Sequence, residues 1–81
     1  MLATINTLPH FEHEVIMARL AWSENSQLNA CYHIARAMQL YILLNDHDIE
    51  YLESNSHDIL DAFYAISCEI DELRDQEDKN I

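Results

Sequence analysis

The sequence contains no glycine and a single proline, Pro9, among its 81 residues. Tight β-hairpins depend on residues that adopt positive φ, and glycine is the commonest of these. A β-rich fold is therefore disfavoured, and helices joined by Asn, Asp and Ser are expected. Apolar residues make up 49% of the chain, too many for a disordered acidic segment. We expect one small all-α domain over residues 1–81.

Positive charge is also scarce, with 4 Lys and Arg against 15 Asp and Glu and a net charge of −11. Residues 1–45 hold only three acids and two arginines, so most of the negative charge falls in residues 46–81. Binding of nucleic acid or of an anionic membrane requires a cationic patch, so neither is expected as a direct partner. A protein partner with a basic surface is favoured, because opposite potentials steer encounter.

Long hydrophobic runs are missing as well. No stretch approaches the ~18–20 apolar residues of a membrane span. The start, MLATINTLPHFEH, has no basic n-region, so no signal peptide is expected. The two cysteines, Cys31 and Cys68, do not form a close motif. These features together favour reduced thiols and a cytoplasmic location.

The apolar spacing predicts three helices. They are expected over about Pro9–Trp22, Ser26–Asn45 and His57–Asp75. The expected inward-facing residues are Phe11, Val15, Ala18 and Trp22 in the first helix, Leu28, Cys31, Ala35, Met38 and Ile42 in the second, and Ile59, Phe63, Ile66, Ile70 and Leu73 in the third. The intervening residues 45–56 are polar and turn-like, with one helical turn suggested by Ile49, Tyr51 and Leu52. Residues 76–81 are expected to form a frayed acidic tail.

The second and third predicted helices have matching heptad seams and a short connection. We expect them to form an antiparallel helical hairpin, with the first helix laid across it, as a small three-helix bundle. The run LYILL at residues 40–44 is hydrophobic all round, so it is either buried or meets a partner. Homodimerisation through this wide apolar face is a second expectation.

Two groups of residues suggest metal ligands. His47-Asp48 and His57-Asp58 repeat one dipeptide, but adjacent side chains on a helix diverge by about 100°, so one pair cannot easily hold one ion. A helix start, where aspartate suits the helix dipole, is the favoured reading of each pair. His10, His13 and Glu14 share a face, but a solvated first turn is favoured for them too. We expect no metal and no cofactor.

Catalysis is not expected either. There is no glycine for a phosphate-binding loop and no nucleophile elbow. Cys31 lies in the predicted seam of the second helix, where a small core residue is the favoured interpretation.

The acidic side of the last predicted helix is the strongest functional signal. Its carboxylates are Asp58, Asp61, Glu69, Asp71, Glu72 and Asp75. They are expected to bind a protein partner, with Leu40, Leu43 and Tyr51 as apolar anchors. The alternative reading is a solvated face that keeps the protein soluble.

Two function classes remain open. Small size, acidity and helicity are properties shared with phage-encoded inhibitors of host defence, such as anti-CRISPR proteins and DNA mimics. An inhibitor or modulator of a protein partner is therefore the leading hypothesis. The alternative is a structural or assembly module, such as an antitoxin-like or adaptor homodimer, that binds through the apolar face of residues 26–45.

Overall fold

A computed structural model describes residues 7–79 of the chain, with side chains as far as residue 74. These residues form four helices and no strand: α1 (Thr7–Ser23), α2 (Gln27–Leu43), α3 (Asp46–Asn55) and α4 (His57–Lys79). The expectation of an all-α fold is confirmed. The expected count of three helices is wrong, because residues 45–56 contain a helix of their own.

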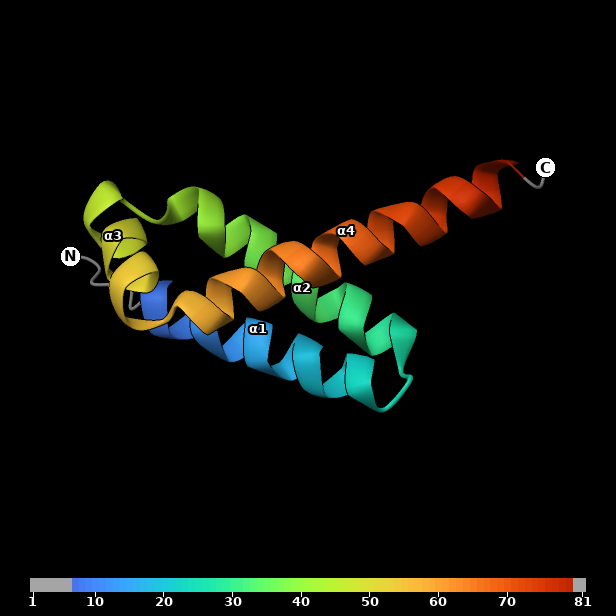
Figure 1. Cartoon of the computed structure of the whole chain (residues 1–81), viewed down its shortest axis with the longest axis horizontal. Helices are drawn as coiled ribbons and strands as arrows, with labels where there is room; N and C mark the ends of the chain where they lie inside the picture. Colours follow the sequence, from blue (N-terminus) through green and yellow to red (C-terminus); the bar gives the residue numbers. More distant parts are fainter. Residues whose placement is uncertain (1–6, 80–81) are drawn as a thin grey trace.

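α1 and α2 form an antiparallel hairpin (Figure 1). The turn depends on Asn25, which has φ of 63° in the left-handed region that asparagine tolerates. The N–H of Ser26 donates to the carbonyl of Ala21 at 2.8 Å, and the N–H of Asn25 donates to the carbonyl of Trp22 at 3.1 Å. These two bonds make the Schellman ending that usually requires glycine. Asparagine thus closes the helix in a chain without glycine.

α3 is a complete helix of 10 residues rather than a turn. The side chain of Asn45 caps it by accepting from the N–H of Asp48 at 2.8 Å. Asp46 and Asp48 occupy its first turn, where carboxylates suit the helix dipole. Leu52 is fully buried and fixes the helix to the core. The polar composition hid this helix, because only one face of it contributes apolar side chains.

α4 has 23 residues and crosses both helices of the hairpin (Figure 1). Its start is fixed to α1, because the hydroxyl of Ser56 donates to Glu12 Oε2 at 3.0 Å. Its last turns extend past the hairpin, and the molecule measures 47 × 26 × 21 Å. The radius of gyration of 13.8 Å exceeds the ~12 Å of a compact domain of this length. The helix continues to Lys79, beyond the expected end at Asp75.

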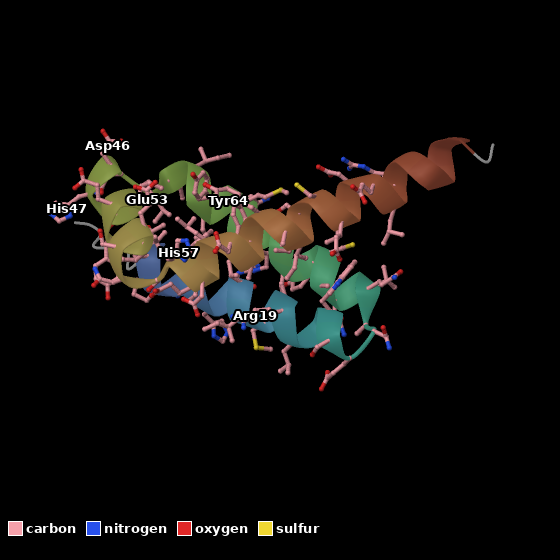
Figure 2. All side chains as sticks on the ribbon, viewed as in Figure 1. Arg19, Asp46, His47, Glu53, His57 and Tyr64 are labelled. Atoms are coloured by element: carbon pink, nitrogen blue, oxygen red, sulfur yellow. The ribbon has the colours of Figure 1, made fainter. Side chains whose placement is uncertain are left out.

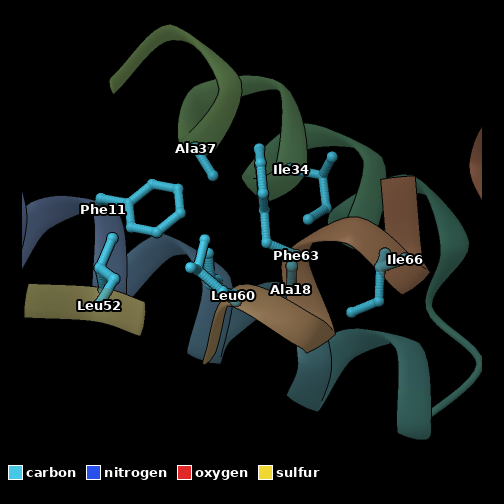
Figure 3. Close-up of a cluster of buried hydrophobic side chains, with 9 residues drawn as sticks. Phe11, Ala18, Ile34, Ala37, Leu52, Leu60, Phe63 and Ile66 are labelled. Carbon is cyan, nitrogen blue, oxygen red and sulfur yellow. The ribbon is translucent and has the colours of Figure 1, made fainter. Parts of the chain in front are cut away.

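All four helices contribute to one core (Figure 3). Its buried residues are Phe11, Val15, Ala18, Ile34, Ala37, Leu52, Leu60, Phe63 and Ile66. The Phe11 and Phe63 rings meet edge to face with centroids 5.1 Å apart, and Tyr41 stacks on Phe63 at 5.3 Å. Such aromatic pairs add about 0.5–1.5 kcal/mol beyond the area they bury.

The expected pairing of the second and third predicted helices is not the main contact. α2 instead packs most extensively along α1 and presents Ala30, Ile34 and Ala37 to the core. The three-residue turn between α1 and α2 holds them side by side, and the alanines let their backbones approach closely. α3 separates α2 from α4 in sequence, so α4 can cross the hairpin. The expected seam of residues 26–45 is consequently directed outward, with Leu28 86% and Ile42 80% exposed.

Candidate interaction surfaces

The outer side of α4, opposite the core, carries four exposed carboxylates. We call Asp58, Asp61, Glu69 and Glu72 the acidic outer face. Exposed Ala65 lies between the two pairs along the helix. The steps of three residues place each pair on neighbouring positions of the helix surface, about 5–6 Å apart at Cβ. The face is therefore a short, dense array of negative charge on a rigid element.

Few cations neutralise this face. His57 Nδ1 lies 3.4 Å from Asp61 Oδ2. The two exposed side chains are one helical turn apart along α4. Among residues whose side chains are described, Asp58, Glu69 and Glu72 make no ion pair. The local field of the face therefore remains largely uncompensated.

Of the six predicted acidic residues, Asp71 lies apart from this face. Asp71 lies at the rim of a groove between α2 and α4, and its Oδ1 accepts from Arg74 Nη2 at 3.2 Å. Each step along a helix turns by about 100°, which moves Asp71 away from its neighbour Glu72. The backbone of Asp75 belongs to α4, but its side chain is outside the described residues.

A groove with a volume of about 560 Å³ lies between α2 and the second half of α4. Its apolar lining consists of Leu28, Cys31, Ile34, Ala35, Met38, Ile70 and Leu73, and Gln27, Asp71 and Arg74 complete it. The groove exists because α4 diverges from the hairpin (Figure 1). Four residues of the expected α2 seam, Leu28, Cys31, Ala35 and Met38, therefore line the groove. They lie opposite Ile70 and Leu73 of α4.

The predicted apolar anchors do not form one cluster. Leu40 is half-buried against the core, whereas Leu43 is 65% and Tyr51 47% exposed on two different helices. Leu28 and Ile42 are the two most exposed large apolar side chains of the described residues, although their spacing predicts core positions. The sequence does contain a signal of this exposure. α2 has apolar residues on two faces, and one neighbouring helix can cover only one of them.

A buried carboxylate connects α1 to α2. Glu14 is 8% exposed, and its Oε1 lies 2.7 Å from His33 Nδ1. Its Oε2 accepts from Arg36 Nε at 3.3 Å, and the guanidinium lies 5.6 Å from the ring centroid of Tyr32. The expectation that Glu14 shares a solvated turn with His10 and His13 is wrong, because only the two histidines are exposed.

This environment changes the acidity of Glu14. Burial raises the pKa of the carboxyl, but hydrogen bonds from His33 and Arg36, together with their positive charge, outweigh it. The net effect is a pKa below the ordinary value of 4.5. The group is thus a structural carboxylate with its partners supplied by α2.

The histidines suspected of metal binding lie apart from other ligands. His47 points outward at the tip of α3, and His57 lies at the start of α4 (Figure 2). Within the described residues, no three His, Cys, Asp or Glu side chains are placed to hold a metal ion. Both cysteines are free thiols, with Cys31 half-buried and Cys68 exposed. None of the described helices combines the length and the apolar character that crossing a membrane requires.

The chain matches no protein-family model, no curated protein and no solved structure.

Proposed function

We propose that this chain is a non-catalytic protein-binding module that docks the acidic outer face of α4 onto a basic surface of another protein. The observation that carries the proposal is the exposure of Asp58, Asp61, Glu69 and Glu72. Among the side chains that the structure describes, only Asp61 has a basic side chain beside it, His57 at 3.4 Å. Opposite potentials accelerate encounter and fix orientation at an interface.

The clustering of like charges on α4 is unfavourable for the isolated protein, and a positively charged partner would offset this cost. Like charges within one turn of a helix destabilise it by about 0.2–0.5 kcal/mol for each pair. A solubilising surface needs charges of both signs more than a block of one sign. A basic protein surface would relieve this repulsion, and the relief would contribute to binding.

The spacing of the carboxylates favours one kind of partner. A row of neighbouring carboxylates on one side of a helix resembles the repeated negative charge of a nucleic acid strand. A partner that uses a basic groove for nucleic acid could accept α4 there instead. In that case the module would inhibit the partner by competition, as the anti-defence hypothesis requires.

The test compares two variants of equal net charge. In the first, the acidic outer face is neutralised by Asp58→Asn, Asp61→Asn, Glu69→Gln and Glu72→Gln. In the second, the matched control, four exposed acids elsewhere are neutralised by Glu24→Gln, Asp46→Asn, Glu50→Gln and Glu53→Gln. Both variants and the wild type are immobilised, and proteins retained from a host lysate are identified at low and at high salt.

The proposal expects a basic protein that the wild type and the control variant retain and the first variant loses. Retention should weaken as salt rises, because screening reduces exposed charge interactions. Equal retention by all three proteins would contradict the proposal. Competition between the retained protein's nucleic acid and the module then decides whether binding is inhibitory.

A second candidate function is an assembly module that acts through the apolar face of α2. The exposure of Leu28 and Ile42 favours it. Salt would have little effect on such an association, which separates it from the first candidate.

A further inference from the structure

The outward side of α2 carries a complete apolar seam. Leu28, Cys31, Ala35, Met38 and Ile42 follow steps of 3, 4, 3 and 4 residues, and we call them the α2 seam. This is the repeat by which two helices pack side by side. Its two ends, Leu28 and Ile42, are the most exposed large apolar side chains of the described chain. The seam has the pattern of a helix pair, but α4 borders it only along the groove side, at Ile70 and Leu73.

The seam has an approximate symmetry about its centre. Leu28 lies seven residues before Ala35, and Ile42 lies seven residues after it. An antiparallel copy of the same helix, related by a two-fold axis at Ala35, would set each Leu28 against the other copy's Ile42. The small side chain at the centre would let the two backbones approach closely.

The charge distribution favours such a contact at α2. Of the four described helices, α2 alone contains no Asp or Glu. Its one arginine, Arg36, is bound to Glu14 of α1. Two chains of net charge −11 repel each other, so they must meet where carboxylates are fewest. That condition selects α2 over the acidic outer face of α4.

We propose that a second copy of this chain docks on the α2 seam as an antiparallel two-fold dimer with its axis at Ala35. Each α2 then lies along the other, flanked by the groove wall that Ile70 and Leu73 form. The acidic outer faces of both α4 helices remain free. The dimer rests on the second candidate function and makes it specific. It is independent of binding through the acidic outer face, and either can fail without the other.

Sedimentation equilibrium from 1 to 200 µM tests the proposal. We expect the wild type to sediment at twice the chain mass at the upper end of this range. Leu28→Glu with Ile42→Glu should raise the dissociation constant by about 100-fold or more, because the apolar contacts at both ends of the seam are replaced by buried charge. The matched control is Ile16→Glu with Leu20→Glu, which alters two exposed apolar residues of α1 and should leave the dimer intact.

Circular dichroism of each variant verifies that the helices remain folded. A wild type that stays monomeric at 200 µM would overturn the proposal, and the α2 seam would then belong to a different protein. The proposal would also be overturned if the control variant dissociated as readily as the variant of the α2 seam.

Disulfide trapping tests the axis itself. In a Cys31→Ser, Cys68→Ser background, Ala35→Cys should form a covalent dimer on mild oxidation, since a disulfide requires Cα atoms about 4.4–6.8 Å apart. Ala65→Cys, on the exposed side of α4, is the control and should remain monomeric. Equal rates of trapping at the two positions, or none at residue 35, would contradict the two-fold arrangement.

Discussion

Glu14 Oε1 lies 2.7 Å from His33 Nδ1, so a buried carboxylate of α1 holds a side chain of α2 that is 19 residues away. Arg36 supplies a second contact at 3.3 Å. These bonds join α1 to α2, the two helices whose packing differs most from the sequence expectation. They hold the hairpin in which the α2 seam is left exposed.

Glu14→Ala should lower the free energy of unfolding by about 1–3 kcal/mol, because it removes the hydrogen bonds that His33 and Arg36 make to a charged carboxylate. Urea unfolding followed by circular dichroism measures the loss. Glu24→Ala is the control, since Glu24 is exposed, and its effect should stay within about 0.5 kcal/mol. A similar loss in both variants would mean that the contacts of Glu14 add nothing to stability.

The contribution of Glu14 should depend on pH. Its pKa in the folded protein lies below the value of 4.5, so folding favours the ionised carboxyl. The stabilisation is fully present above pH 4.5 and is lost as the pH falls through the lower folded value. The difference in unfolding free energy between wild type and Glu14→Gln should accordingly shrink between pH 6 and pH 3. A difference that stays constant or grows toward pH 3 would contradict this assignment.

Leu52→Ala should destabilise the protein by about 2–5 kcal/mol, as expected for a fully buried leucine. The neighbouring substitution Tyr51→Ala removes a side chain that is 47% exposed and should cost much less. Urea midpoints of the two variants provide the comparison. If Leu52→Ala were as stable as the wild type, α3 would not be part of the core.

The phenol of Tyr64 should titrate unusually late. A hydrogen bond with Tyr41, at 3.1 Å between the hydroxyl oxygens, raises its pKa to about 12, and partial burial and the negative charge of Glu53 on α3 (Figure 2) add to the effect. Absorbance at 295 nm should show one of the four tyrosines ionising well above pH 10. Tyr41→Phe should return that step toward pH 10. A wild-type titration complete by pH 11 would exclude the bond.

The helical class of the fold was predictable because glycine is absent and apolar residues recur at helical spacing. The packing was not. Leu28 and Ala30 belong to different faces of α2, both apolar, and periodicity alone cannot decide which face a neighbour covers. The three-residue turn at Asn25 decides it, by setting α1 against the face with the small residues.

The acidic outer face was only partly predictable. The four carboxylates Asp58, Asp61, Glu69 and Glu72 share a side as their spacing indicates, whereas Asp71 is rotated to the groove. The role of Glu14 could not be read from its neighbours His10 and His13. Its partners come from α2, and only the folded hairpin brings them close.

The most direct test of the binding proposal is photo-crosslinking from Ala65, which lies within the acidic outer face. With p-benzoylphenylalanine at this position, irradiation in host cells should give a discrete adduct with a basic protein. The same group in place of Leu20, on the exposed side of α1, should not. An adduct specific to residue 65 is the predicted result, and no adduct there, or the same adducts from both positions, would contradict the proposal.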